Sequence, residues 1–189
     1  MDKEKKKEGK MDMESMMETY KKLATPGPVH KLLEKLTGSW VTRTKARMDP
    51  NKPPVESTGT CVQKMILGGR YLQQEYTGDM MGEKFNGINL IGYDNQTGKI
   101  VSIWIDNMST GINYFEGTAS ADGKTLTQKS SLDDPVRGHL LWRSVTKFLD
   151  DNTLGYEMYI TPEGGKEVKE MEMTVTRKEA AKAAPSKAA

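Results

Sequence analysis

The chain has 189 residues, of which 29% are charged, with a formal net charge of +2 and a single cysteine. This length suits one domain with a hydrophobic core, the near-neutral charge argues against a nucleic-acid partner, and one cysteine excludes an internal disulfide framework. No apolar run reaches the roughly 20 residues of a membrane span, and the charged start of the chain is no secretory signal, so we expect a cytoplasmic protein without a membrane partner.

Residues 1–28 are expected to form a charged arm followed by an amphipathic helix. The helix is predicted over residues 11–24, where five apolar side chains recur at spacings of three and four: Met13, Met16, Met17, Tyr20 and Leu23. It must stop at Thr25-Pro26-Gly27-Pro28, because proline cannot continue a helix. A methionine-rich face of this kind packs on its own domain or on a partner. A homo-oligomer through residues 11–24 is the partner expected there.

A second short helix is predicted next, and from Gly38 the apolar period changes from about four to two. The helix carries one apolar face: Val29, Leu32, Leu33 and Leu36. Ten strands separated by turn-forming residues follow: 39–48, 56–67, 70–78, 84–93, 99–107, 111–119, 124–132, 138–149, 154–161 and 167–178. Such short connections leave no room for crossover helices, so the strands must pair antiparallel in sequence order.

The predicted fold class is therefore all-β, an antiparallel up-and-down β-barrel of about ten strands over residues 29–178. Closure into a barrel is favoured because it removes exposed strand edges, and a two-sheet sandwich is the alternative. Residues 179–189 form an Ala/Lys-rich tail that we expect to be flexible.

Alternation along the strands divides the side chains into two rows. In 99–107, one row is aliphatic and the other holds Trp104 and Asp106, so the sequence does not decide which of the two rows faces the barrel interior. Rows that combine aromatic and polar groups are typical of ligand cavities, and a barrel of this size can enclose one small ligand. The predicted lining residues of a site for a small, largely apolar molecule are Trp104, Trp142, Tyr156 and Met158, with Asp106 or Arg143 orienting the ligand. The alternative is a barrel filled by side chains, with the polar groups at its rim or in solvent.

Several segments resemble known families. Gly38-Ser39-Trp40 after a short helix, with Arg177 near the end of the last strand, resembles the calycin pattern of lipocalins and fatty-acid-binding proteins. This resemblance implies a cation–π pair of Trp40 and Arg177 that closes the barrel, worth roughly 0.5–2 kcal/mol. Five further segments are similar to the bacterial, lipocalin-like family 1579 of domains of unknown function: Met65–Leu72, Gly87–Asp94, Trp104–Gly111, Glu157–Tyr159 and Met171–Arg177.

The resemblance covers about residues 29–178 and departs from the family at Gly82-Glu83-Lys84-Phe85, where a Met-Pro-Phe-like segment is usual. It implies the fold and brings no activity with it. An enzyme that uses an in-barrel carboxylate as general base, Asp106 or Glu157 beside Glu172, therefore remains an alternative. It predicts that replacing that carboxylate abolishes turnover without unfolding the protein.

Cofactor sites are disfavoured by the residues present. Barrels similar to nitrobindin hold haem through one strand histidine, but His30 is expected in a helix and His139 at a rim. Two distant histidines and one cysteine make a poor set of metal ligands. Cys61 lies in a strand-like run, where a buried, unreactive thiol is expected. We therefore predict no cofactor and no metal site.

Overall fold

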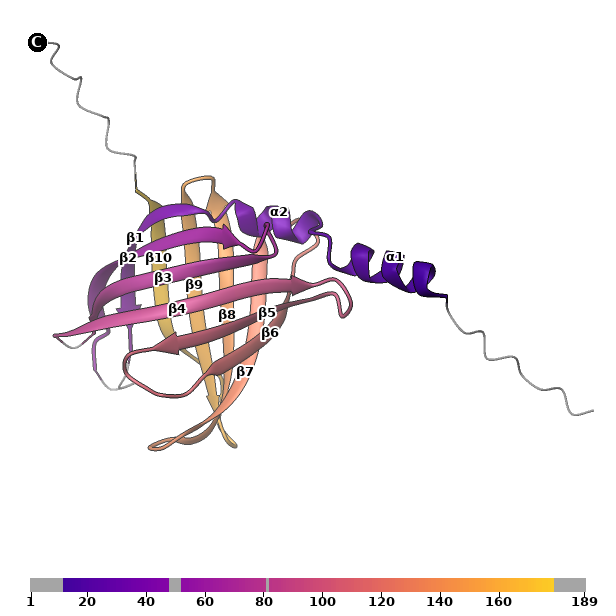
Figure 1. Cartoon of the computed structure of the whole chain (residues 1–189). Helices are drawn as coiled ribbons and strands as arrows, with labels where there is room; N and C mark the ends of the chain where they lie inside the picture. The colour runs from indigo at the N-terminus through magenta and orange to yellow at the C-terminus, as the bar shows by residue number, and fades with distance from the viewer. Residues whose placement is uncertain (1–11, 48–51, 81, 179–189) are drawn as a thin grey trace, which may run out of the picture.

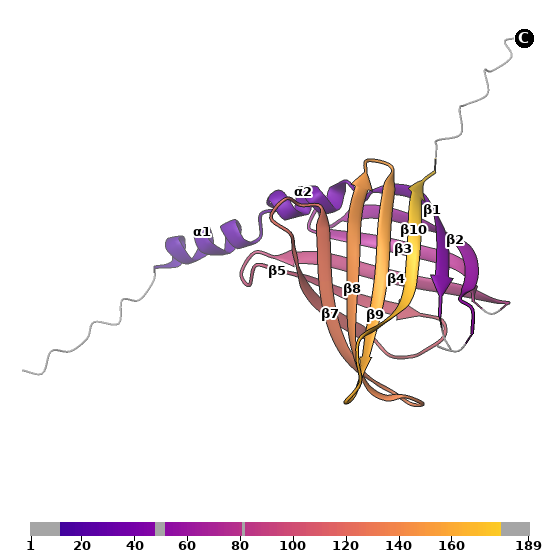
Figure 2. The ribbon, with the colours of Figure 1, turned by 180° about the vertical axis from the view of Figure 1, so that it is seen from behind.

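The structure, a computed structural model, describes residues 12–47, 52–80 and 82–178. These residues form two short helices and a closed barrel of ten antiparallel strands (Figures 1 and 2). The helices are α1 (Met13–Leu23) and α2 (Pro28–Glu34). The strands are β1 (Gly38–Ala46), β2 (Val55–Ile66), β3 (Tyr71–Met80), β4 (Glu83–Asp94), β5 (Lys99–Asp106), β6 (Asn113–Ala119), β7 (Thr125–Asp134), β8 (Gly138–Asp150), β9 (Thr153–Pro162) and β10 (Val168–Arg177). The predicted barrel is confirmed and the sandwich alternative is wrong. The expected charged arm (residues 1–10) and tail (179–189) lie outside the described residues.

Each strand pairs with its neighbours in sequence, and β1 closes the barrel by pairing with β10. This closing register places Trp40 opposite Arg177 and Ala46 opposite Met171. In Figure 1 the strands β2–β6 run across the front, and β8–β10 cross behind them. Because every strand has two partners, the described sheet exposes no unpaired edge.

Helix α2 covers one end of the barrel, which we call the closed end. Pro28 occupies its first turn, where a proline costs no hydrogen bond. The Gly27 amide donates to Nδ1 of His30 at 2.9 Å, and burial lowers the pKa of this histidine, so it stays neutral and caps the helix. The apolar face of α2 then packs onto the core cluster: Leu33, Leu36, Trp40, Cys61, Leu72, Ile91, Ile100, Leu126, Leu154 and Val175.

The closed end is fastened by Trp40 and Arg177. The guanidinium carbon of Arg177 lies 4.1 Å from the centre of the Trp40 ring, so the cation–π pair implied by the sequence is present. Nη1 and Nη2 of Arg177 donate to the carbonyl oxygens of Thr37 at 2.6 Å and Lys35 at 3.0 Å. The indole Nε1 of Trp40 donates to the carbonyl oxygen of Leu36 at 2.8 Å. These contacts join the segment after α2 to the first and last strands.

Helix α1 extends away from the barrel, as both views show (Figures 1 and 2). Asp12 caps its start by accepting the Ser15 amide at 2.8 Å, which confirms a helix in the predicted segment. Nδ2 of Asn95, in the β4–β5 turn, donates to the carbonyl oxygens of Leu23 at 2.7 Å and Thr25 at 2.8 Å. No residue of α1 is buried, so its methionine face does not pack on the described barrel.

Candidate ligand-binding site

The interior of the barrel is tightly packed at the closed end and is less completely buried toward the other end, which we call the open end. Alternation and pairing register decide which side chains point inward. Those near α2 are almost fully buried, for example Leu72 and Ile100, both 0% exposed. Toward the open end the inward-facing side chains are mixed in burial. Phe85, Leu140 and Ile160 are 8%, 0% and 6% exposed, whereas seven others are half-buried: Ser57, Met80, Trp104, Asn113, Ser130, Met158 and Met171. We call the space that these half-buried side chains border the lumen; its wall is less tightly packed than the core cluster.

A polar ring lies between the packed core and the open end, and its members carry no charge. They are Thr42, Gln63, Gln74, Asn89, Ser102, Gln128, Ser144 and Tyr156. Nε2 of Gln74 donates to Oε1 of Gln63 at 2.7 Å, and Nδ2 of Asn89 donates to Oε1 of Gln74 at 3.0 Å. Nε2 of Gln128 donates to Oγ of Ser102 at 2.9 Å. The ring is therefore an ordered hydrogen-bonding surface.

Four buried polar atoms of the inner wall have no hydrogen-bond partner among the described residues: Oγ1 of Thr42, Oγ1 of Thr44, Oδ1 of Asn89 and Nε1 of Trp142. They belong to β1, β4 and β8, which are separated by three, four and three steps around the ten-strand barrel. The atoms therefore point inward from three sides. More than 90% of buried polar groups in folded proteins are hydrogen-bonded, so these four atoms, each with less than 1 Å² of accessible surface, are exceptions that ordered water or another molecule would have to satisfy.

Aromatic rings line the lumen on two sides. On one side, the ring of Phe85 lies 5.7 Å from that of Tyr76 and 6.2 Å from that of Trp104, centre to centre. On the other side, the rings of Phe115 and Trp142 are 6.1 Å apart. Such walls supply apolar area and flat faces to a ligand.

The predicted lining residues Trp104, Trp142, Tyr156 and Met158 all lie on inward-facing rows. Tyr156 lies deepest, and burial raises the pKa of its phenol to about 12. The residue as a whole is half-buried, and its phenol hydrogen-bonds with Ser144 of β8. A phenol with this pKa stays protonated near neutral pH.

The two predicted orienting groups do not act as expected. Arg143 points outward, where Nε and Nη2 donate to Glu167 at 2.7 and 2.6 Å and the guanidinium lies 3.9 Å from the centre of the Tyr159 ring. It alternates with the inward-facing Trp142, so the prediction that it orients a ligand is corrected. Asp106 faces inward at the rim, but Nε1 of Trp104 donates to its Oδ2 at 2.7 Å and the Met108 amide to its Oδ1 at 2.9 Å. Its carboxylate therefore accepts hydrogen bonds from the rim itself, so the prediction that it orients a ligand has no support from these contacts.

The carboxylates of the enzyme alternative lie outside the lumen or are already engaged. Glu157 faces outward between Lys147 at 2.7 Å and Lys169 at 2.9 Å, and Lys169 also contacts Glu172 at 3.2 Å. Hydrogen bonds from Lys147 and Lys169 lower the pKa of Glu157 to about 2. A carboxylate with so low a pKa is a weak base, so nothing in this arrangement favours Glu157 as a catalytic group.

Replacing Glu157 with glutamine is expected to lower the free energy of unfolding by about 1 kcal/mol at neutral pH and low salt, because solvent screens this partly exposed network. The pKa is lower in the folded protein (about 2) than in the reference state (4.5). The stabilisation is therefore present above pH 4.5 and declines as the pH falls toward 2. Urea unfolding across this range measures it. The control is Glu172→Gln, which removes one longer contact; equal effects of the two substitutions would contradict the prediction.

Neither histidine faces the lumen. His30 caps α2, and Nδ1 of the exposed His139 lies 2.8 Å from Oδ1 of Asp133 on the outer surface. A haem bound through histidine would thus find no ligand in the barrel. Burial raises the pKa of Cys61 to about 12, so its thiol is unreactive. The described residues hold no group of three metal-ligating side chains.

Most of the polar ring was missed by the sequence prediction, although a signal for part of it exists. Thr42 and Thr44 alternate with Trp40, so the row that contains this tryptophan already places both threonines inside the barrel. Gln63 likewise shares a row with Cys61. The amide chain from Gln63 to Asn89 depends on the register of three strands, which no local pattern gives.

The comparisons with known proteins agree with this fold. A model of the family described as "Protein of unknown function (DUF1579)" matches residues 25–177. No curated protein matches the sequence. No helix of the described residues has the length and apolar character needed to cross a membrane.

Two solved structures are similar over most of the chain. The crystal structure of Rv2717c from M. tuberculosis has 16% sequence identity and a TM-score of 0.59, covering 82% of this chain and all of that one (100%). The S-type phycobiliprotein lyase CPES from Guillardia theta has 12% identity and a TM-score of 0.58, covering 82% of this chain and 95% of that one. At such identities the likeness shows the fold alone.

Proposed function

The chain belongs to the family described as protein of unknown function DUF1579, and from that premise we propose that it binds a small molecule non-covalently inside the open half of its barrel. The observation that carries this proposal is the set of four unpartnered polar atoms that point inward from β1, β4 and β8. A solved barrel of similar fold is named a phycobiliprotein lyase, which is compatible with a barrel that accommodates another molecule. The proposal itself rests on the residues of this chain.

The lumen has the composition of a binding site. Apolar and aromatic surface comes from Trp104, Trp142 and Met158, and the polar ring below supplies hydrogen-bonding groups. Ligand sites in proteins combine a mostly apolar wall with a few placed polar groups in this way. A barrel that served only as a structural unit would gain stability from filling this volume with apolar side chains.

Native mass spectrometry of the protein purified from its own host tests the proposal directly. The expected result is an added mass that is lost when the same sample is denatured. The opposing result is a clean mass of the chain alone, together with no change in tryptophan fluorescence when apolar dyes are added. In that case the barrel would be a structural unit.

Replacing Thr42 with valine is expected to raise the free energy of unfolding of the ligand-free protein by about 1 kcal/mol. The buried hydroxyl has no partner, so its removal ends a desolvation cost without losing a hydrogen bond. The same change should reduce the fraction of protein that carries the added mass. Urea unfolding and native mass spectrometry measure the two effects. Thr60→Val is the matched control because Thr60 is exposed on the neighbouring strand; a Thr42→Val variant that is less stable than the parent would contradict the prediction.

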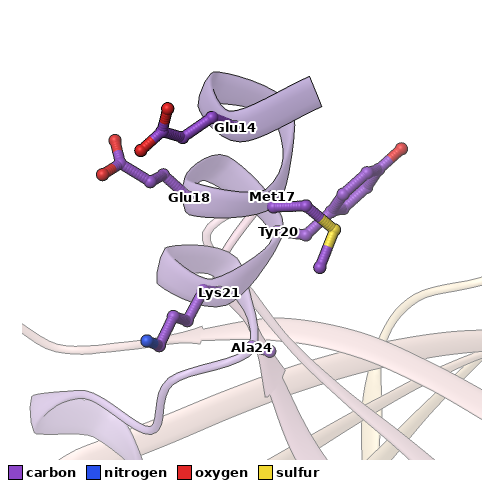
Figure 3. A pocket seen from close by; sticks show the side chains of 6 residues that line it. All are labelled: Glu14, Met17, Glu18, Tyr20, Lys21 and Ala24. Atoms are coloured by element: carbon purple, nitrogen blue, oxygen red, sulfur yellow. The ribbon is translucent and has the colours of Figure 1, made fainter. Parts of the chain in front are cut away.

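We also propose that a second copy of the chain packs on α1. Met13, Met17 and Tyr20 are between 60% and 70% exposed, and an isolated helix this short is marginal in water unless its apolar face is covered. An open surface patch lies along the helix, with Met17 and Tyr20 on one side and Glu14, Glu18 and Lys21 on the other (Figure 3). Its lining residues are Glu14, Met17, Glu18, Tyr20, Lys21 and Ala24.

The charges of α1 favour an antiparallel pair of copies. Glu14 lies in the first turn, and Lys21 and Lys22 lie in the last turn. Antiparallel packing brings the acidic end of each helix to the basic end of the other. Sedimentation should show a dimer that Met17→Glu dissociates and that Val136→Glu, at a 90% exposed site on the barrel, leaves intact. A parent protein that stays monomeric at its highest soluble concentration would overturn this proposal.

A further inference from the structure

We infer that the molecule held in the barrel is uncharged, carries a planar ring, and has both a hydrogen-bond donor and a hydrogen-bond acceptor. This inference rests on the proposed binding function and specifies its ligand class. It follows from three properties of the lumen, namely its charge, the polarity of its unpartnered atoms and the orientation of its rings.

The described residues of the inner wall offer no cation to an anionic ligand. Between Arg177 at the closed end and Asp106 at the open rim, the polar ring consists of amides, hydroxyls and a phenol. Arg177 is fully engaged by Trp40 and by backbone carbonyls. An unpaired charge in such a site costs several kcal/mol. A carboxylate, phosphate or sulfonate is therefore excluded from the ring.

The charges at the open end also act against anions. Asp106 adds a negative charge to the rim near Trp104. Farther along the open end, Arg137 is held by Asp134 at 3.1 Å and Glu170 at 2.5 Å, which leaves one excess carboxylate in that triad. Asp106 and the Arg137 triad each contribute one excess negative charge at this end of the barrel, and like charges repel at this range. A neutral molecule enters without this penalty.

The unpartnered atoms require a ligand with both kinds of hydrogen-bonding group. The amides of Gln63, Gln74 and Asn89 form a chain in which each donates to the preceding one. The chain ends in Oδ1 of Asn89, an acceptor that no described group satisfies. Nε1 of Trp142 is a donor without a partner, four strands away around the barrel. A ligand that spans the lumen satisfies both if it offers a donor to Asn89 and an acceptor to Trp142.

The aromatic rings present flat faces because glycines let them lie against the wall. A Cβ atom at Gly87 would collide with the indole of Trp104, and a Cβ atom at Gly78 would lie 2.6 Å from Oη of Tyr76. With glycine at both positions, the two rings occupy the space next to the backbone. Flat rings along the wall favour offset stacking with a planar ligand.

Three dyes test the inference on the full-length protein. N-phenyl-1-naphthylamine is neutral and carries a planar naphthalene ring and one N–H donor, and 8-anilinonaphthalene-1-sulfonate is the same skeleton with a sulfonate. Prodan is neutral and planar and carries a carbonyl acceptor. We expect both neutral dyes to bind, and we expect the sulfonate to displace N-phenyl-1-naphthylamine with an affinity at least about tenfold weaker. Equal or tighter binding of the sulfonate overturns the inference.

Two variants separate the hydrogen-bonding roles. Asn89→Leu should weaken the binding of N-phenyl-1-naphthylamine about five- to tenfold and leave the affinity for prodan unchanged. Trp142→Phe should weaken the binding of prodan by a similar factor and leave the affinity for the amine unchanged. Gln73→Leu is the control, since Gln73 sits on the outer face and donates to Glu75 at 2.7 Å. If neither variant discriminates between the dyes, the assigned donor and acceptor are wrong. If no dye binds, this inference is wrong. The proposed function is wrong as well only if native mass spectrometry also shows the mass of the chain alone, without an added molecule.

Discussion

Truncating Trp40 to alanine is expected to lower the free energy of unfolding by about 3–5 kcal/mol, the usual cost of removing a large buried aromatic ring. Trp40 is 1% exposed and lies in the core cluster beneath α2. The substitution removes the hydrogen bond to Leu36 and the ring that faces Arg177. The guanidinium would then lose its stacking partner while its hydrogen bonds to backbone carbonyls remain. Urea unfolding followed by circular dichroism gives the magnitude.

Two further variants separate the contribution of ring packing from that of the hydrogen bonds at the closed end. Trp40→Phe keeps a ring in the core but loses the indole N–H, so an intermediate loss of about 1–2 kcal/mol is expected. Arg177→Met keeps much of the side-chain length and removes the charge-assisted bonds to Thr37 and Lys35, for which about 2 kcal/mol is expected. A loss below about 1 kcal/mol for Trp40→Ala would show that the closed end does not support the barrel.

Replacing Gly117 with alanine should destabilise the protein by about 3 kcal/mol, although only one methyl group is added. A Cβ atom at this position would collide with the carbonyl oxygen of Thr127 and lie 2.6 Å from Cα of Gln128. Both contacts are with the backbone of β7, which pairs with β6 through Gly117 and Gln128. A flexible side chain could turn away from a new methyl group, but a paired strand cannot move without losing its hydrogen bonds.

The matched control for this effect is Gly111→Ala. Gly111 has no positive φ, and a Cβ atom there would meet nothing within 4 Å. Its replacement should change the free energy of unfolding by less than about 0.5 kcal/mol, as is usual for exposed positions. In thermal unfolding, the loss for Gly117→Ala corresponds to a melting temperature lower by about 6–12 °C for a domain of this size. Similar melting temperatures for the two variants would refute the close approach of β6 and β7.

Substitutions at the closed end and substitutions in the polar ring should affect stability and ligand binding differently. Losing Trp40 or Gly117 should impair folding, and any loss of ligand would follow from that. Losing the hydroxyl of Thr42 should instead stabilise the chain and weaken binding, because an unsatisfied buried group serves the ligand at a cost in stability. Opposite signs of the stability change therefore distinguish structural residues from binding residues in this barrel.

The number, order and approximate bounds of the strands were determined by the sequence itself. Alternation of apolar and polar residues and turn-forming residues are local signals, and both were present from Gly38 to Arg177. Short connections then allowed only antiparallel neighbours. The pair of Trp40 and Arg177 followed from family resemblance, and the closing register places the two residues opposite each other.

Only the tertiary structure decided which row of each strand faces the lumen. In β5 the aliphatic row lies outside, where Ile105 is 38% exposed beside Ile88 of β4 at 41%. Because that row is the more apolar one, local hydrophobicity alone would have placed it inside, and the sequence left the choice open. Trp104 and Asp106 occupy the inner row because the closed barrel fixes the same inward direction for every strand.

The polar ring and its unpartnered atoms also depend on the whole barrel. Gln63, Gln74 and Asn89 are far apart in the chain and become neighbours only through the registers of β2, β3 and β4. Arg143 was predicted to orient a ligand because of its charge, and its place on the outer row corrects this. Alternation along a strand is a property of the local backbone, so the sequence reveals it. Hydrogen-bond partners across strands are set by register and closure, so they emerge only when the barrel is complete.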